Sequence, residues 1–232
     1  MNVLSILFHW LKDVLFPIAC IGCGKEGNWY CAVCWQQSTW QAVALCPACG
    51  QATEHGKTCQ NCQAVSSLNG VTAFFLYKEG VPFTQLIRLF KYNYAHDIIS
   101  VWRQLLARER LAYLAQTQPL VVMPVPLYPQ RERKRGFNQA RILAELIAQQ
   151  YGWEFVGEEL QRTRATVQQA RLTREGRFKN VANAFVWEGK SSPERVLLVD
   201  DVFTTGATMQ ECARVLKAAG TQFVWGLTLA RD

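Results

Sequence analysis

The sequence predicts an α/β protein built on a parallel sheet, with a small metal-binding module toward its N-terminus. Two apolar runs, Val196–Val199 and Leu120–Met123, lack the alternation of a half-exposed strand and are typical of strands buried on both faces. Apolar residues at helical spacing come after each run, as expected of βα units. The module is indicated by the cysteines, because eight of the nine form C-x-x-C pairs before residue 63.

The chain of 232 residues, half of them hydrophobic, is long enough for one sizeable core plus a small module. Its formal net charge of +7 is unevenly distributed. Residues 1–62 contain three lysines and three acidic residues, so the whole positive excess lies after residue 62. The larger domain, residues 67–232, is therefore expected to meet an anion such as a phosphate or a nucleic acid.

Residues 1–19 are predicted to contain an amphipathic helix, because apolar side chains recur on one helical face between residues 3 and 16. Such a helix either docks on the core of this protein or contacts a partner or a membrane surface. His9, Lys12 and Asp13 interrupt the segment, which is too short to span a bilayer. It lacks the basic start and the cleavage site of a signal peptide, so a cytoplasmic location is expected.

Residues 20–66 form the cysteine module, whose C-x-x-C turns have the spacing of tetrahedral metal sites that zinc usually occupies. Pairing in chain order predicts two structural Zn²⁺ sites. One would use Cys20, Cys23, Cys31 and Cys34, and the other Cys46, Cys49, Cys59 and Cys62. The spacing alone leaves interleaved pairing, disulfides and an iron–sulfur cluster open.

Aromatic residues and one histidine lie among the cysteines. The aromatic side chains are expected to cover the metal sites or, where they are exposed, to stack on bases. They are Trp29, Tyr30, Trp35 and Trp40. His55 is interpreted as a surface residue, because four thiolates already complete the second metal shell.

A linker at residues 63–70 leads into the larger domain, which begins with a predicted strand at residues 71–77 and helices at 82–92 and 97–115. Arg88 and Lys91 are interpreted as a solvated helix face. The family resemblance given below, in which a basic Lys-Tyr segment lies here, leaves a role near the substrate open. The buried strand at 120–123 then runs into three prolines within residues 124–129, which cannot continue a sheet or a helix.

A dense basic run follows the prolines, with Arg131, Arg133, Lys134 and Arg135 within five residues. The pattern predicts a loop at the carboxyl edge of the sheet that holds an anion, ahead of a helix carrying Ile142 to Ile147. A solvated surface turn is the alternative. Residues 160–180 are predicted to form a mobile basic loop followed by a helical turn, bordering the same site, with a disordered surface loop as the alternative. A short strand is predicted between 181 and 187.

The central strand ends in two carboxylates, Asp200 and Asp201, followed by a turn that opens a helix. The turn consists of Thr204, Thr205, Gly206, Ala207 and Thr208. Free backbone N–H groups and hydroxyls at a helix N-terminus suit a phosphate, and adjacent carboxylates suit sugar hydroxyls or a ligand-borne Mg²⁺. The pattern therefore predicts a sugar-phosphate site, against the alternative of an acidic turn with a helix cap. Cys212 on the following helix is interpreted as packing, and a final strand at 222–230 is expected to close the sheet.

The thirteen residues from Val196 to Thr208 resemble the phosphoribosyl-diphosphate signature of type I phosphoribosyltransferases. The resemblance implies that Asp200 and Asp201 hold the ribose hydroxyls, that the 204–208 turn wraps the 5′-phosphate, and that the ligand brings Mg²⁺. It also implies that the basic run holds the diphosphate. The fold class expected is thus a type I phosphoribosyltransferase-like parallel sheet with an N-terminal double zinc ribbon.

The Pro-Val-Pro at 124–126, the basic run and Arg-Gly-Phe-Asn-Gln at 135–139 are similar to the ComF/GntX family of competence and DNA-uptake proteins. This resemblance covers essentially the whole chain. It implies a cytoplasmic bacterial protein of natural competence or external DNA use that binds phosphoribosyl diphosphate with Mg²⁺ and acts as a phosphoribosyltransferase. Single-stranded DNA and proteins of the DNA-uptake machinery are the implied partners. The alternatives are a non-catalytic single-stranded-DNA-binding module on the same fold, or a metabolite-sensing regulator.

Overall fold

The computed structural model describes residues 17–38, 42–92, 95–108, 111, 120–166 and 173–232. The helix predicted for residues 3–16, Trp40 and part of the predicted basic loop, residues 167–172, lie outside these ranges. Within them, no helix has both the length and the apolar character needed to cross a lipid bilayer.

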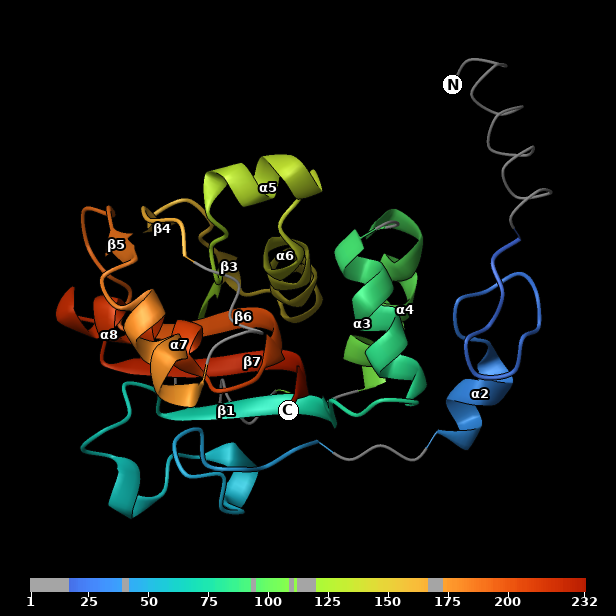
Figure 1. Cartoon of the computed structure of the whole chain (residues 1–232), viewed down its shortest axis with the longest axis horizontal. Helices are drawn as coiled ribbons and strands as arrows, with labels where there is room; N and C mark the ends of the chain where they lie inside the picture. Colours follow the sequence, from blue (N-terminus) through green and yellow to red (C-terminus); the bar gives the residue numbers. More distant parts are fainter. Residues whose placement is uncertain (1–16, 39–41, 93–94, 109–110, 112–119, 167–172) are drawn as a thin grey trace.

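Five parallel strands form the central sheet in the order β1-β7-β6-β2-β3 (Figure 1). The strands are β1 (Gly70–Leu76), β2 (Val121–Pro124), β3 (Glu154–Phe155), β6 (Arg195–Phe203) and β7 (Phe223–Arg231). The α/β class and the parallel sheet are therefore confirmed. The last strand was expected to close the sheet, but β7 lies inside it, between β1 and β6.

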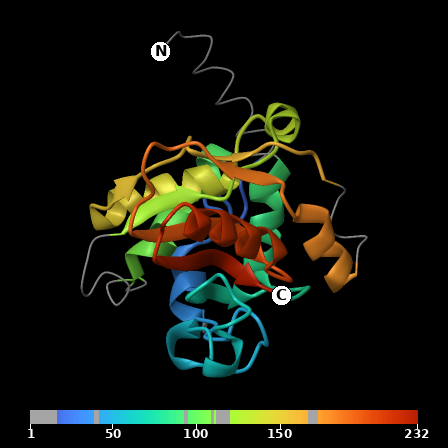
Figure 2. The same ribbon diagram turned by 90° about the vertical axis from the view of Figure 1, so that its left-hand side faces the viewer.

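Successive residues of β6 face opposite sides of the sheet, which explains its uninterrupted apolar run. Leu197 and Val199 join one buried cluster, and Val196 and Leu198 join another. Residues of α3 (Pro82–Tyr92), α4 (Ala95–Arg108) and α6 (Gln139–Tyr151) belong to the first cluster, whereas α8 (Ala207–Ala218) contributes to the second (Figure 1, Figure 2). Both faces of the sheet are thus covered by helices.

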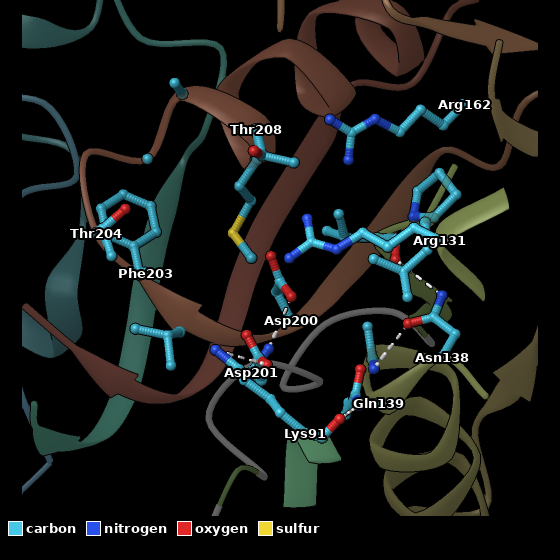
Figure 3. Close-up of a pocket in the computed structure, with 18 of the residues that line it drawn as sticks. Lys91, Arg131, Asn138, Gln139, Arg162, Asp200, Asp201, Phe203, Thr204 and Thr208 are labelled. Carbon is cyan, nitrogen blue, oxygen red and sulfur yellow. Dashed lines mark hydrogen bonds and ion pairs between the residues drawn. The ribbon is translucent and has the colours of Figure 1, made fainter. Parts of the chain in front are cut away.

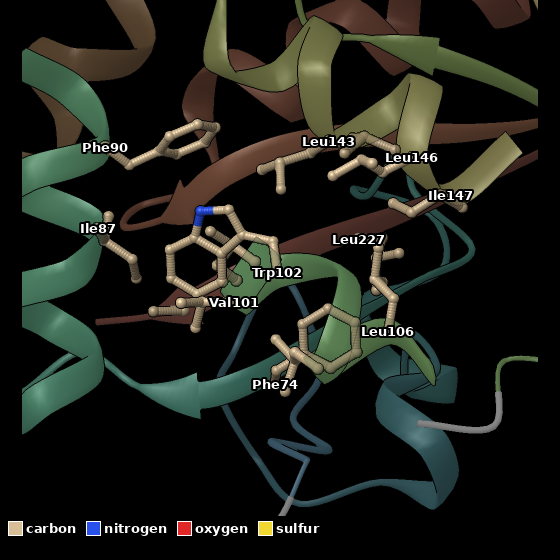
Figure 4. Close-up of a cluster of buried hydrophobic side chains, with 14 of the residues drawn as sticks. Phe74, Ile87, Phe90, Val101, Trp102, Leu106, Leu143, Leu146, Ile147 and Leu227 are labelled. Atoms are coloured by element: carbon tan, nitrogen blue, oxygen red, sulfur yellow. The ribbon is translucent and has the colours of Figure 1, made fainter. Parts of the chain in front are cut away.

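The first cluster is centred on Trp102 of α4, which is completely buried. Figure 4 shows its indole ring with Ile87 and Phe90 of α3 on one side and Leu143 of α6 on the other. This packing joins α3 to α6 and so fixes the end of α3 next to the start of α6. The predicted helix at 82–92 is confirmed, whereas the helix predicted for 97–115 begins at Ala95 and its described part ends at Arg108.

The basic run at residues 131–135 is helical, so the prediction of a loop there was wrong. It forms α5 (Pro129–Arg135), in which Pro129 takes the first helical turn. Proline is tolerated at that position, where its missing N–H has no helical partner to lose. Gly136 ends the helix in the left-handed region with a φ of 87°, and its N–H donates to the Glu132 carbonyl.

A two-stranded antiparallel ribbon flanks the second face of the sheet. It pairs β4 (Leu160–Arg162) with β5 (Phe185–Trp187), and Arg162 lies opposite Phe185. The short strand predicted between 181 and 187 is confirmed only in its second half. Val181 instead ends α7 (Arg174–Val181), which follows the undescribed segment 167–172.

The two halves of the cysteine module dock at different places on the sheet domain (Figure 1). The first half includes α2 (Ala32–Gln37) and packs on α3, with the rings of Tyr30 and Trp35 4.9 and 5.6 Å from that of Phe83. The second half includes the short turns η1 (Glu54–Gly56) and η2 (Gln60–Cys62) and runs along β1 through antiparallel bridges. These bridges join Val43 to Ala73 and Lys57 to Gly70.

Candidate functional site

The eight C-x-x-C cysteines gather into two groups of four, as pairing in chain order predicted. One contains Cys20, Cys23, Cys31 and Cys34, and the other contains Cys46, Cys49, Cys59 and Cys62. The sulfur atoms of each group lie within 4.8 Å of one another. The interleaved alternative is therefore wrong.

The sulfur spacing fits a tetrahedral zinc ion. A Zn–S bond of about 2.3 Å places two sulfurs of a tetrahedron roughly 3.8 Å apart. The Sγ–Sγ distances are 3.6 Å for Cys20 and Cys34, 3.7 Å for Cys23 and Cys31, and 3.7 Å for Cys49 and Cys59. Because all eight cysteines are free, the disulfide alternative is not formed. The donor set is that of two structural zinc sites.

Backbone donors favour the thiolate form that a metal requires. Burial raises the pKa of Cys20, but backbone N–H groups such as that of Cys31 outweigh it and bring this pKa to about 6. The same balance, with backbone N–H groups of the Cys49 turn and Cys59, lowers the pKa of Cys46 to about 6. Each group of four therefore contains at least one cysteine whose pKa is lowered toward the thiolate form that binds a metal.

The aromatic residues around the first group of zinc ligands pack against the sheet domain, and His55 lies on the surface. Tyr30 and Trp35 are buried against α3, so these two rings are not available to stack on bases. Trp29 is half-buried against the same cluster. His55 lies on the surface beside Glu54 with about half of its side chain exposed, as the sequence predicted.

A cavity of about 460 Å³ lies at the carboxyl edge of the central strands (Figure 3). Its walls come from the end of β6, the following turn, α5, and the adjoining ends of α3 and α6. Ligands of open α/β sheets bind at this edge. The structure thus places the predicted carboxylates, the turn and part of the basic run around one space.

Asp200 and Asp201 both line the cavity, although β6 continues past them to Phe203. Asp201 accepts an ion pair from Lys91 of α3 at 3.1 Å. Burial, followed by the charge of Asp201, raises the pKa of Asp200 to about 7, and Lys91 and Arg162 only partly oppose this. This shift favours protonation of Asp200, and the charge of a bound cation would oppose it.

The turn after β6 directs the N-terminus of α8 toward the cavity. Thr204, Gly206, Ala207 and Thr208 line it. Thr205 does not, and its hydroxyl instead accepts from the Ala207 N–H at 3.5 Å. The helix dipole and the first N–H groups of this twelve-residue helix suit an anion.

The basic helix α5 presents only part of its charge to this cavity. Arg131 and Arg135 are one turn apart, lie on the same face and line it. Lys134 lines a neighbouring cavity, and Arg133 lines neither. The sequence analysis predicted that all four cations contact the same anion. Because the segment is helical, they are divided among different faces.

Lys91 was interpreted as solvated, and this was wrong for that residue. Its side chain is 25% exposed and paired with Asp201. The side-chain amide of Gln139 donates to the carbonyls of Phe90 and Lys91, which ties the end of α3 to the start of α6. The solvated interpretation is confirmed for Arg88, which is half-exposed and pairs with Glu79.

Arg162 belongs to the segment 160–180 that was predicted to border the site, but it was not singled out as a ligand residue. It lines the cavity from β4. It is only 8% exposed, and its guanidinium lies 5.2 Å from the ring of Phe185. Burial lowers its pKa. Asn138 has a positioning role, because its side chain caps α6 through the Ala140 N–H and donates to the Val125 carbonyl.

Comparisons with known proteins agree with this architecture. A profile described as a double zinc ribbon domain matches residues 11–63. DNA utilization protein YhgH of Salmonella typhimurium is 31% identical over 210 residues, which cover 85% of this chain and 88% of that protein. Competence protein F of Haemophilus influenzae is 30% identical over 93% of this chain and 98% of its own length.

A third relative is also named a competence protein. Competence protein ComFC of Streptococcus pneumoniae is 29% identical over 226 residues, covering 95% of this chain and 96% of that protein. The matches cover 85 to 95% of this chain and 88 to 98% of the three relatives. The chain therefore belongs to the ComF family, the group that includes the competence proteins F and ComFC and the DNA utilization protein YhgH.

Proposed function

We propose that the cavity binds phosphoribosyl diphosphate with Mg²⁺ and that the protein transfers the phosphoribosyl group to an acceptor during the use of external DNA. Asp200 and Asp201 hold the ribose hydroxyls, and the 204–208 turn holds the 5′-phosphate. The observation that supports this best is the single cavity shared by the carboxylates, the N-terminus of α8, and Arg131 and Arg135.

The positive charges that line the cavity would stabilise the diphosphate as it leaves the ribose. The bond between ribose C1 and the diphosphate oxygen breaks and its electron pair leaves with the diphosphate, while an electron pair of the acceptor forms the new bond to C1 and the acceptor's proton passes to solvent. Arg131 and Arg135 stabilise the negative charge that develops on this leaving group. Mg²⁺, when bound, neutralises part of the same charge. Lys91 holds Asp201 in place at 3.1 Å.

The test measures diphosphate released from phosphoribosyl diphosphate in the presence of Mg²⁺, with and without single-stranded DNA. The Asp200→Asn variant should lose about 100-fold or more in turnover, the scale expected when a group that contacts the reacting sugar is removed. Glu79→Gln, on an exposed carboxylate outside the cavity, is the control and should retain wild-type turnover. If the wild-type protein releases no diphosphate with any acceptor tested, the proposed transferase activity is contradicted.

A second function is favoured by the positive excess after residue 62 and by the names of the relatives. In this case the cavity and its basic surroundings bind single-stranded DNA without catalysis. DNA binding that weakens steeply with salt, survives Asp200→Asn and occurs without turnover would support it. We also propose a cytoplasmic location and contacts with DNA-uptake proteins, since reduced thiols of this number persist in a reducing compartment.

A further inference from the structure

A buried glutamine joins two walls of the cavity at the carboxyl edge of the sheet. Gln139, the first residue of α6, lines this cavity but is only 2% exposed. Its side-chain oxygen accepts from the guanidinium of Arg135, at the end of α5. Its side-chain nitrogen donates to the carbonyls of Phe90 and Lys91 at 3.4 and 3.3 Å. One amide therefore contacts both the basic helix α5 and the end of α3.

An amide at this position suits both neighbours. The carbonyls of Phe90 and Lys91 belong to the last turn of α3, where carbonyls have no partner within the helix and need a donor from outside. The guanidinium of Arg135 has donors only, so it needs an acceptor. A carboxylate at position 139 would repel the two carbonyls, and an apolar side chain would leave all three groups without this partner. Gln139 therefore satisfies polar groups of two separate helices at once.

The contact with α3 continues to the carboxylates. Lys91 extends from the end of α3 to Asp201, and its ammonium lies 3.1 Å from the nearer carboxylate oxygen (Figure 3). A lysine ammonium is a point charge on a flexible stem, so its position depends on where its backbone is held. Its positive charge also counters the repulsion between the adjacent carboxylates of Asp200 and Asp201. Gln139 thereby fixes, through Lys91, a carboxylate that is proposed to hold the sugar.

We infer that Gln139 is a positioning residue that makes the site prefer ribose to 2-deoxyribose, because it holds Lys91 and so keeps Asp201 turned toward the sugar hydroxyls. A site rejects a sugar that lacks a hydroxyl when the polar group left unpaired cannot turn to another partner. The contact with Arg135 holds the diphosphate side of the cavity against the same amide, so the sugar and the leaving group keep one relative position. The inference rests on the proposed function, since it concerns the sugar of the same ligand.

The test measures the affinity of the full-length, zinc-loaded protein for two sugar phosphates by calorimetry in the presence of Mg²⁺. Ribose 5-phosphate and 2-deoxyribose 5-phosphate differ by one hydroxyl, and both carry the phosphate that the turn after β6 is proposed to hold. The wild type should bind ribose 5-phosphate about tenfold or more tightly, the scale of one hydrogen bond to a charged group. Gln139→Met, which keeps the length of the side chain and removes its polar atoms, should reduce this ratio of affinities to less than about threefold.

Further variants separate positioning from stability. Lys91→Met, at a side chain that is 25% exposed, removes the contact between α3 and Asp201 and should lower the ratio to the same extent. Combined with Gln139→Met, it should lower the ratio no further, because both substitutions act through Asp201. Gln149→Met, at an exposed residue of the same helix, is the matched control and should keep the wild-type ratio. A general loss of stability would weaken binding of both sugar phosphates together and leave their ratio unchanged.

Three results would overturn the inference. They are equal affinity of the wild type for the two sugar phosphates, a wild-type ratio in Gln139→Met, and an effect of Gln139→Met on the ratio that is undiminished in the Lys91→Met protein. A failure of the proposed function looks different. If the wild type binds neither ribose 5-phosphate nor phosphoribosyl diphosphate, that function is wrong and the inference falls with it. If the wild type binds both but Gln139→Met keeps the ratio, only the inference is wrong.

Discussion

Replacing Cys49 and Cys59 with serine is expected to unfold the second zinc ribbon and to abolish ligand binding in the sheet cavity. A structural zinc site contributes about 10 kcal/mol or more to the folding of a small ribbon. The second ribbon also supports the site directly. Arg231, at the end of β7, donates to the Leu45 and Cys46 carbonyls at 2.6 and 2.8 Å.

The same arginine connects the ribbon to the phosphate turn. Its guanidinium lies 4.9 Å from the ring of Phe203, which lines the cavity just before the turn. A further link runs from α8, where Gln210 accepts from the Ser67 N–H at 2.8 Å. Loss of the ribbon would therefore release both the end of β6 and the helix whose N-terminus faces the cavity.

The matched control replaces Cys23 and Cys31 in the first ribbon, whose Tyr30 packs on Phe83 of α3. Both double variants should bind one zinc ion fewer, measured as zinc per chain, and both should unfold at a lower temperature by circular dichroism. Only the second-ribbon variant should lose about 100-fold in affinity for phosphoribosyl diphosphate. Equal losses of affinity in the two variants would show that the second ribbon has no special link to the cavity.

Replacing Gly206 with alanine should have the second-largest effect, because this position has no room for a Cβ. Its φ of 76° lies in the left-handed region, and a Cβ would come within 2.3 Å of the Phe203 ring. The left-handed backbone conformation alone lowers the free energy of unfolding of the alanine variant by about 1–2 kcal/mol. Relief requires either the ring or the turn to move, so affinity for the sugar phosphate should fall by about 100-fold.

Gly152→Ala is the matched control for backbone strain. Gly152 ends α6 with a φ of 67°, but a Cβ there has open space around it. Both variants should lose about 1–2 kcal/mol of unfolding free energy in urea from the backbone strain, and Gly206→Ala should lose more because its Cβ meets Phe203. Only Gly206→Ala should lose affinity in calorimetry. A Gly206→Ala protein that binds the ligand normally would show that the turn does not hold the phosphate.

The features that the sequence predicted are those encoded by neighbouring residues. The strand, the carboxylates and the turn from Val196 to Thr208 are contiguous, so their order alone places them at one sheet edge. The zinc groups were predictable for a similar reason, because C-x-x-C turns pair locally. The apolar periods predicted strands β1, β2, β6 and β7 and helices α3, α4, α6 and α8, and for these only the ends differed.

The features that were missed depend on contacts between distant segments. Lys91 reaches Asp201 because Gln139, 48 residues later in the chain, holds the end of α3 through a backbone carbonyl. Arg162 is buried because β4 pairs with β5, a contact that no local pattern in its basic segment indicates. The helical form of α5 was missed because prolines precede it, although Pro129 itself begins the helix.

The central claim is that the carboxylates and the turn after β6 together hold a phosphorylated ribose. A crystal structure of the zinc-loaded protein with phosphoribosyl diphosphate and Mg²⁺ tests it most directly. The account predicts the 5′-phosphate at the N–H groups of Gly206 to Thr208 and the ribose hydroxyls at Asp200 and Asp201, with the diphosphate toward Arg131. A ligand bound outside this cavity, or a ribose that contacts neither carboxylate, would contradict it.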